Sequence, residues 1–217
     1  MTPSGPKRIS PIKLIDGSLR KPVDAELWSP ITETNLADWE AVWQPELQKQ
    51  INLLRQAGVH RQLWPQSRKW DWRAKQAALT QRLGSASFAI VHAGMTQAMM
   101  ILDYARRAKA AGEEGRHLAY VDFLEAAPWN RKTLTGGTPR FAGSGTILIG
   151  TAVQCSIQQG FKGRIGLHSL PQSNDFYANV CGMVDLGADP NYERLRYFEM
   201  TPEIATRFLK IGKRHGS

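Results

Sequence analysis

The amino-acid sequence predicts a mixed α/β fold in which one helix connects two parallel strands. Residues 117–126 (HLAYVDFLEA) form an apolar, β-prone run, and residues 164–170 form a second one. Between them, residues 143–159 place apolar side chains at helical spacing and stop before Gly160. A helix that crosses over between two strands makes those strands parallel, and this arrangement is typical of α/β domains.

The length and composition favour one globular domain with an appendage. The chain has 217 residues, of which 42% are hydrophobic and 22% charged. No run approaches the roughly 18 uninterrupted apolar residues that a membrane span requires. The first ten residues lack the apolar block of a secretory signal, so we expect a cytoplasmic protein with no membrane partner. Cys155 and Cys181 have no paired spacing, and we expect neither a disulfide framework nor a metal site.

The net charge of +9 raises the question of a nucleic-acid partner. Residues 1–22 carry five Lys or Arg against one Asp, and residues 204–217 carry four against none. The rest of the chain is therefore nearly neutral. Two basic tails suit salt-sensitive attraction to any polyanion, or simple solvation, better than a shaped groove. A nucleic-acid partner is possible on these grounds but is not favoured.

The first third of the chain divides into two predicted segments. Residues 1–30 contain five prolines, too closely spaced for a helix, and are expected to form a basic, irregular arm. Residues 31–84 are expected to form a helical N-terminal extension, with helices at 46–57 and 71–83 that stop at glycines. Six tryptophans fall between residues 28 and 72. They could line a site for a flat substrate, but packing is the favoured interpretation.

Residues 85–217 are expected to form the main α/β domain. Residues 88–92 and 95–102 fit a β-hairpin that turns at Ala93-Gly94, although the periodicity of 99–102 also fits a helix. Pro202 stands at a tolerated first-turn position of a terminal helix. Besides the strands and helix described above, this domain is predicted to contain a short helix at 173–181 and strands at 183–186 and 194–200.

The segment Arg140-Phe-Ala-Gly143-Ser-Gly145-Thr146 opens the long helix directly after a strand and a loop. The first amide N–H groups of a helix are unpaired and carry partial positive charge, and glycines let a phosphate approach that backbone. A P-loop would need Lys after the last glycine, and a dinucleotide fingerprint would need a third glycine at Leu148. Neither fits, and the segment predicts a diphosphate cradle of another kind.

The cradle matches the pattern Arg/Gln-x-x-Gly-x-Gly/Ala. Before it a strand ends in Ala126-Ala-Pro128, and after it comes the segment Asp175-Phe-Tyr177-Ala-Asn-Val-Cys-Gly182-Met. In this order the features resemble those of the GNAT acetyltransferases, over residues 85–200. The chain departs from the family pattern at Met183, where Phe is usual, and at Leu170, where an Asn that contacts CoA is common. The insertion 131–139 before the cradle is also unusual.

The resemblance implies a single GNAT-like domain, with a mixed sheet, a splayed parallel strand pair and flanking helices. The splay would separate residues 124–126 from residues 166–169, with acetyl-CoA as cosubstrate in the gap. The pyrophosphate would lie against Arg140 and the backbone of Phe141, Ala142, Gly143, Ser144, Gly145 and Thr146. The pantetheine arm would bond to the strand at Leu124, Glu125 and Ala126, and Asn174 is a further candidate contact.

Attack of an amine on the thioester requires a neutral amine and a proton for the departing thiolate. Tyr177 occupies the position of the family's proton-donating tyrosine, although it could simply pack. Asp122 is the preferred base, because it shares a strand face with Leu124 and a partly buried carboxylate can have a raised pKa. A structural role for Asp122, deprotonation through water, and His168 as the base are the alternatives.

The predicted function is transfer of an acetyl group from acetyl-CoA to a primary amine, with the acceptor unknown. One alternative is a macromolecular acceptor, either a protein amine or aminoacyl-tRNA, recruited by the basic tails. Another is a non-catalytic module that binds CoA and uses the tryptophans to engage a partner. The remaining alternative is an unrelated α/β protein in which Gly143 simply begins an ordinary helix. A homodimer is possible in each case.

Overall fold

The computed structural model describes residues 8–79, 81–82, 84–134 and 136–214. Within them, hydrogen bonds join nine strands in the order β6-β1-β2-β3-β4-β5-β7-β9-β8. The chain divides into two compact units. Unit 1 contains the described residues up to Met100 and Leu124–Gly145, and unit 2 contains Ile101–Phe123 and the described residues from Thr146 onward. Both units are discontinuous in sequence, whereas the predicted boundaries fell after residues 30 and 84.

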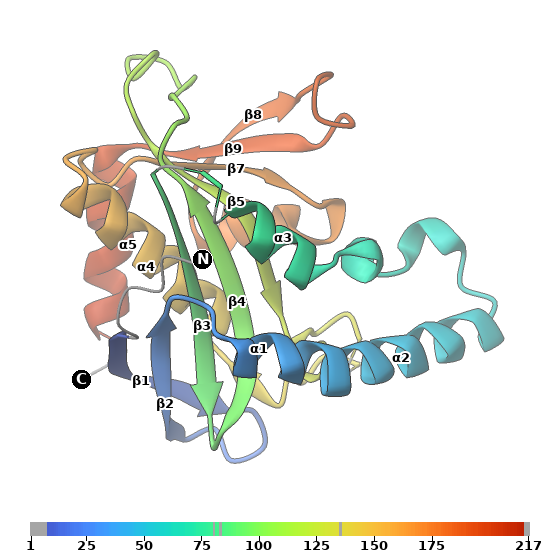
Figure 1. Cartoon of the computed structure of the whole chain (residues 1–217). Helices are drawn as coiled ribbons and strands as arrows, with labels where there is room; N and C mark the ends of the chain where they lie inside the picture. The colour runs from blue at the N-terminus through green and yellow to red at the C-terminus, as the bar shows by residue number, and fades with distance from the viewer. Residues whose placement is uncertain (1–7, 80, 83, 135, 215–217) are drawn as a thin grey trace. The chain divides into compact units, whose positions relative to one another are not determined.

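Unit 1 contains an antiparallel set of strands (Figure 1). In the hairpin of β1 and β2, the register runs from Arg8↔Ser29 to Ile15↔Pro22. Strand β2 pairs on its other side with β3. The hairpin predicted at residues 88–102 is confirmed as β3 and β4. Its turn at Ala93 and Gly94 has positive φ values of 48° and 75°. The strands are β1 (Arg8–Asp16), β2 (Pro22–Ser29), β3 (Ser85–His92), β4 (Met95–Asp103, of which the first six residues belong to unit 1) and β6 (Phe141–Ala142).

The expectation of an irregular arm at the start of the chain is wrong for residues 8–29, which form β1 and β2. Prolines are tolerated on edge strands and at the first residue of a strand. Pro11 lies on β1, whose second neighbour β6 covers only Ile15 and Asp16, and Pro22 begins β2. In the connecting turn, the Asp16 carboxylate accepts hydrogen bonds from two following amides. Residues 1–7 of the predicted arm lie outside the described residues.

Unit 1 has helices where residues 31–84 were predicted to be helical, but α3 ends at Leu79, and the described residues 81 and 82 of the helix predicted at 71–83 are not helical. Residues 80 and 83 lie outside the described part. The segment consists of α1 (Glu33–Asp38), a π-helical turn (Trp39–Trp43), α2 (Gln44–Gln56), short 3₁₀ turns and α3 (Trp72–Leu79). Buried Asn35 donates to the Thr96 hydroxyl at 3.0 Å, and the Trp43 indole donates to the Thr96 carbonyl at 3.0 Å. Trp43 and Trp72 are fully buried, which confirms the packing interpretation for these two.

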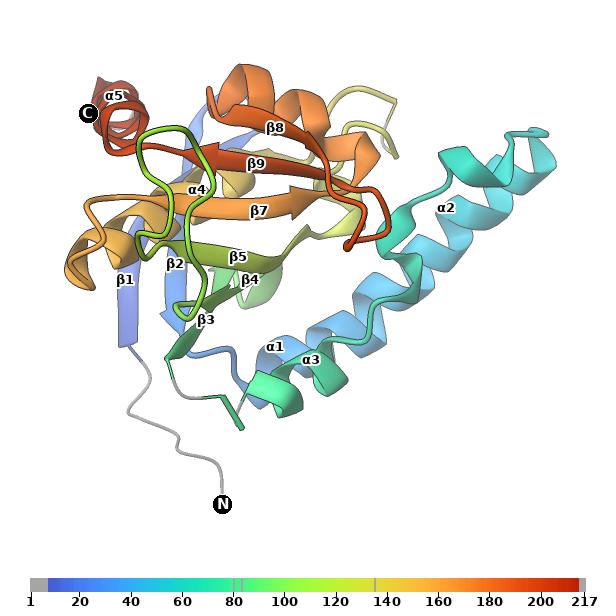
Figure 2. The same ribbon diagram turned by 90° about the horizontal axis from the view of Figure 1, so that it is seen from above.

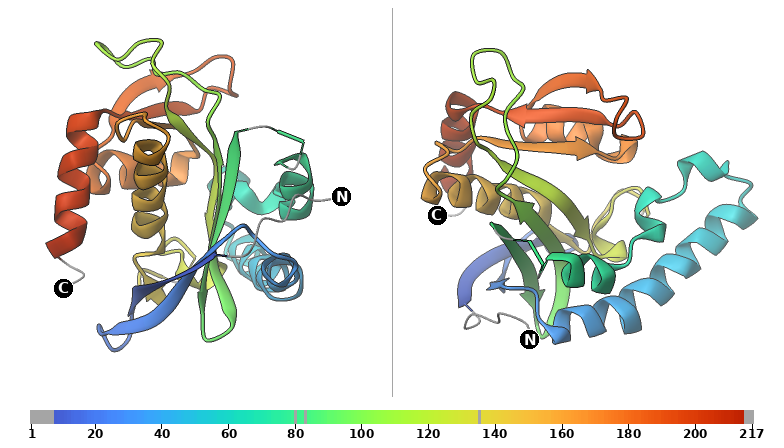
Figure 3. Two further views of the ribbon diagram at one scale, coloured as in Figure 1. Left: turned by 60° about the vertical axis from the view of Figure 1, so that its left-hand side comes forward. Right: turned by 45° about the horizontal axis from the view of Figure 1, so that its top comes forward.

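Unit 2 confirms the remaining predicted elements. Helices α4 and α5 lie side by side (Figure 3), and a Cβ added to Gly150 of α4 would lie 3.9 Å from the Phe208 ring of α5. The strands β7, β9 and β8 lie in that order (Figure 2). The elements are α4 (Ser144–Gln158, from Thr146 onward in this unit), β5 (Ala119–Ala126, up to Phe123 in this unit), β7 (Ile165–Ser169), a π-helical turn (Phe176–Val180), β8 (Val184–Ala188), β9 (Arg196–Met200) and α5 (Pro202–Arg214).

The crossover through α4 makes β5 and β7 parallel, as predicted. Their pairing covers Ala119↔Ile165 and Tyr120↔Gly166. Within the described residues of unit 2, neither residues 121–123 nor residues 167–169 have a partner on the other strand. Strand β7 instead continues its antiparallel pairing with β9. A Cβ at Gly166 would lie 2.6 Å from the Tyr197 hydroxyl, so a larger residue at this strand position would displace the buried Tyr197 side chain.

Candidate functional site

The predicted diphosphate cradle is a glycine turn at the start of a long helix. Gly143 has a φ of +96°, which favours glycine, and α4 begins at the next residue. A Cβ added to Gly143 would have no heavy atom of the described residues within 4 Å, apart from its chain neighbours, so the space beside this residue is open. The first amides of α4 have no partner within the helix and carry partial positive charge. This backbone can therefore receive an anion at close range.

The chain just before the cradle is held in place by the turn between β1 and β2, which contains Gly17. The Phe141 amide donates to the Asn130 side-chain oxygen at 2.8 Å, and the Gly17 amide donates to the Arg140 carbonyl at 2.9 Å. A Cβ at Gly17 would lie 1.8 Å from the Pro139 carbonyl oxygen, so only glycine fits there. Sequence reasoning missed these two contacts. The contact of Gly17 joins segments more than 100 residues apart in the chain, and the contact of Asn130 joins residues about ten apart.

Arg140 makes no ion pair with a carboxylate in the part of the chain that the structure describes. Its guanidinium lies over the Phe141 ring, 5.4 Å from the centroid. It also lines a hollow of about 480 Å³ in unit 1, together with Trp129 and Met95 and residues of the helical segment. The positive charge is thus available to a ligand, and its predicted contact with pyrophosphate stays a prediction.

The Glu125 side chain is part of a buried network in unit 1. It is 4% exposed and accepts a hydrogen bond from the Trp72 indole and one from Arg131, each at 2.5 Å. Arg131 also donates to the Ala126 carbonyl at 2.7 Å and to the Ser67 hydroxyl at 2.8 Å. The start of the 131–139 insertion is therefore anchored. The carboxylate of Glu125 is held by this network, which leaves only the backbone of residues 124–126 for the predicted pantetheine contacts.

In unit 2, Tyr177 lies in the π-helical turn and is 7% exposed. Its ring packs against Phe176 and Phe198, at centroid distances of 5.1 and 6.0 Å. Burial raises the pKa of the Tyr177 hydroxyl above its ordinary value of 10, so the phenol stays protonated at neutral pH. The hydroxyl therefore carries a proton at the pH at which a thiolate would form.

Asn174 lies three residues before Tyr177 in the same unit. Its side-chain oxygen is buried and has no hydrogen-bond partner among the described residues. A buried acceptor without a partner is costly, and native proteins rarely leave one without a reason. An incoming N–H donor would satisfy it.

His168 is the centre of a second buried network, which lies entirely in unit 2. Its Nδ1 is 2.6 Å from the Tyr120 hydroxyl, and its Nε2 is 3.2 Å from the Asp189 carboxylate. Lys109 donates to the same Asp189 oxygen at 2.8 Å. The imidazole stacks on the Tyr192 ring at a centroid distance of 3.9 Å.

Burial, rather than the charges in this network, is the main reason why the imidazole stays neutral. Burial lowers the pKa of His168, although Asp189 opposes this effect. Hydrogen bonding to Lys109, first among several causes, holds the pKa of Asp189 below its ordinary value, so the carboxylate is ionised. An ionised Asp189 requires a donor at His168 Nε2, and we therefore assign the accepting lone pair to Nδ1, opposite the Tyr120 hydroxyl.

Asp122 is half-buried on β5, two residues after Tyr120 and on the same strand face. Burial is the main cause that raises the pKa of Tyr120, and the negative charge of Asp122 is the next. The predicted base Asp122 thus acts on Tyr120 through its charge, and the Tyr120 hydroxyl in turn lies 2.6 Å from Nδ1 of the alternative base His168. Sequence reasoning missed Tyr120 as a functional group, and its alternation with Asp122 was the available signal.

The predicted site residues divide between the two units. Thr146, Asn174, Asp122 and Tyr177 belong to unit 2, and the other predicted cofactor residues belong to unit 1. In the described part of the chain, no three His, Cys, Asp or Glu side chains lie together as a metal site would require. None of the described helices is both long and apolar enough to cross a membrane.

No protein-family model matches the chain, and no curated protein matches its sequence. The GNAT domain of S. lividans PAT matches in structure with a TM-score of 0.50, at 14% identity, over 88% of this chain and 96% of that one. Mycobacterium smegmatis RimJ in complex with CoA-disulfide matches at 16% identity over 95% of both chains, with a TM-score of 0.47. FeeM, an N-acyl amino acid synthase from uncultured soil microbes, matches at 10% identity over 82% of this chain and 92% of that one, with a TM-score of 0.46.

The match to the S. lividans domain extends beyond the region of sequence resemblance. Residues 85–217 make up only about three-fifths of the chain, so a match over 88% of it includes much of the segment before residue 85. The helices predicted as an appendage are thus at least in part an element of the fold itself. With its mixed sheet, the parallel pair of β5 and β7 and its flanking helices, the chain has the fold of the GNAT acetyltransferases.

Proposed function

We propose that the chain is an N-acyltransferase that moves an acetyl group from acetyl-CoA to a primary amine by direct attack. The observation that carries the proposal is the glycine turn at Gly143, which opens α4 on the crossover between the two parallel strands of a GNAT fold. A fold alone serves many functions, so the assignment rests on this turn and on the side chains described above.

Three features of the chain suit the parts of an acyl-CoA molecule. The amides at the start of α4 and the free charge of Arg140 suit the pyrophosphate. The backbone of residues 124–126 suits the pantetheine arm, as a strand-like partner. The buried Asn174 oxygen suits a pantetheine amide N–H, because it accepts no other hydrogen bond among the described residues.

Tyr177 is the proposed proton donor. When the amine nitrogen bonds to the acyl carbon, the carbon–sulfur bond breaks and the electron pair leaves with sulfur. The thiolate then takes the phenolic proton. Burial favours this role in one respect, because it keeps the phenol protonated until the thiolate forms.

Tyr120 and Asp122 are the proposed groups that receive the amine's proton. Asp122 can accept it directly. In the second route the amine proton passes to the Tyr120 oxygen while the Tyr120 proton passes to His168 Nδ1. The imidazolium formed there is stabilised by the ionised Asp189 at Nε2. Both routes leave a neutral amine for attack.

A thiol-release assay with acetyl-CoA and a broad panel of amines tests the proposal. We expect CoA release with at least one amine, and we expect Tyr177→Phe to lower kcat by about 100-fold with little change in acetyl-CoA affinity. Phe keeps the packing against Phe176 and Phe198, so it is the matched variant. Binding of acetyl-CoA with no release for any amine would instead support a non-catalytic CoA-binding module.

A further inference from the structure

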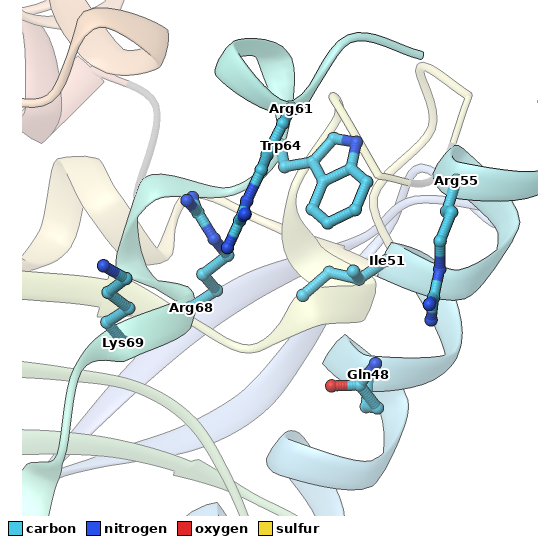
Figure 4. Close-up of a pocket in the computed structure, with 7 residues that line it drawn as sticks. All are labelled: Gln48, Ile51, Arg55, Arg61, Trp64, Arg68 and Lys69. Carbon is cyan, nitrogen blue, oxygen red and sulfur yellow. The ribbon is translucent and has the colours of Figure 1, made fainter. Parts of the chain in front are cut away.

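A basic groove lies in unit 1 between α2 and the chain that returns from it. Figures 1 and 2 show this return segment running back beside α2 towards α3. Gln48, Ile51 and Arg55 share one face of α2 because they are three and four residues apart. The return segment contributes Arg61, Trp64, Arg68 and Lys69, and together these seven residues line about 450 Å³ (Figure 4).

The four cations of the groove have no carboxylate partner within the described residues. The sequence from Leu47 to Trp70 contains no Asp or Glu at all. Elsewhere in the same helical segment, Arg73 pairs with both Glu33 and Glu40. Like charges that converge on one groove repel each other, and an anionic ligand would relieve that repulsion.

Trp64 presents an aromatic ring in the middle of these charges. Its indole N–H donates to the Val59 carbonyl at 2.9 Å, which fixes the ring, and the side chain is half-buried. In Figure 4 the ring lies between Arg55 on one side and Arg61 and Arg68 on the other. An aromatic ring flanked by arginines is the arrangement on which unpaired bases stack while their phosphates are neutralised.

A neighbouring hollow of about 540 Å³ extends the groove, and it shares Arg61 and Arg68 with it. Gln66 lines this hollow, and its side-chain oxygen is buried without a hydrogen-bond partner among the described residues. The oxygen can accept from a base amino group or a ribose hydroxyl. A ligand with phosphates alone would leave it unsatisfied.

We propose that this groove binds single-stranded nucleic acid. The phosphates lie against Arg55, Arg61, Arg68 and Lys69, one base stacks on Trp64, and Gln66 accepts a hydrogen bond from the strand. A concave groove does not suit a flat membrane surface, and the ring and the buried amide oxygen favour a nucleic acid over a simple polyanion. All of these residues lie in unit 1, and the inference does not depend on acyl transfer.

Fluorescence anisotropy with a short, unstructured, labelled RNA tests the groove in the full chain. We expect Arg61→Gln/Arg68→Gln to weaken binding about 10-fold and to reduce the slope of log affinity against log salt by about 1.4, since single strands contribute about 0.7 per phosphate. The matched control is Arg20→Gln/Lys21→Gln, which removes two exposed charges from the β1–β2 turn. It should change neither the affinity nor the salt slope by more than about 2-fold. Equal losses in the two variants would overturn the groove in favour of diffuse attraction.

Two further arms test the base contact. Trp64→Ala should weaken RNA binding about 10-fold, whereas Trp64→Phe should bind nearly as tightly as the wild type and lose the RNA-induced quenching of tryptophan emission. Thermal unfolding of each variant shows whether it is folded. Polyphosphate, polyglutamate or anionic vesicles that bind as tightly as the RNA, and depend equally on Trp64, would reject nucleic acid as the ligand class.

Discussion

The buried carboxylates of Glu125 in unit 1 and Asp189 in unit 2 have different partners. Glu125 in unit 1 is held by the guanidinium of Arg131 and the indole of Trp72, neither of which exchanges its proton at ordinary pH. Asp189 in unit 2 also has a fixed cation, Lys109, but it faces in addition the imidazole of His168, which is neutral and is hydrogen-bonded to Tyr120. The first network can only hold the chain in place. The second can pass a proton, and this is why we propose it for chemistry.

The largest effect should come from the network of unit 1. Arg131→Ala would leave the Glu125 carboxylate buried without its cation, and we expect a loss of about 3–5 kcal/mol in the free energy of unfolding. Urea denaturation measures this loss. Adding Glu125→Gln to the variant should restore a large part of it, because the unpaired charge is then gone. A stability equal to that of the wild type in Arg131→Ala would contradict the structural role of the pair.

The next effect should appear in activity rather than stability. Tyr120→Phe removes the hydroxyl that lies 2.6 Å from His168 Nδ1 but keeps the ring, and we expect kcat to fall by about 10- to 100-fold. Steady-state kinetics with the best amine measures it. If kcat falls only in Asp122→Asn and not in Tyr120→Phe, the direct route through Asp122 holds. If neither variant changes kcat, the second network is as structural as the first.

The smallest effect is a pH dependence of stability. The pKa of His168 is lower in the folded chain than its ordinary value of 6.5, so the unfolded chain binds more protons below that pH. The contribution of His168 is complete above pH 6.5 and declines as the pH falls below it. We expect His168→Asn to flatten the fall in melting temperature between about pH 6.5 and 5. An unchanged pH profile would mean that this histidine is not held neutral.

Local patterns in the sequence predicted most of the helices and strands but not the polar networks. The hairpin at Ala93-Gly94 and the helix ending before Gly160 are fixed by nearby residues, so spacing and glycines were enough. Strand β1 was missed because its identity comes from pairing with β2 and β6, and the five prolines of residues 1–30 outweighed that weak local signal.

The site shows the same limit. The cradle at Gly143 is a contiguous motif and could be proposed from the sequence, whereas Tyr120, His168 and Asp189 are far apart in the chain and meet only through folding. The basic groove was concealed for another reason. The body of the chain is almost neutral in sum, and that sum hides a stretch of 24 residues, 47–70, without a single carboxylate.

Calorimetric titration with acetyl-CoA tests the central claim, the cradle at the start of α4, most directly. Gly145→Glu places a negative charge in the first turn of α4, where it favours the helix but repels a phosphate. The control Gln154→Glu adds the same charge at an exposed position on the same helix. We expect the wild type and the control to bind acetyl-CoA with similar affinity, and Gly145→Glu to lose at least about 10-fold. Absence of binding by the wild type, or equal binding by all three proteins, would contradict the account.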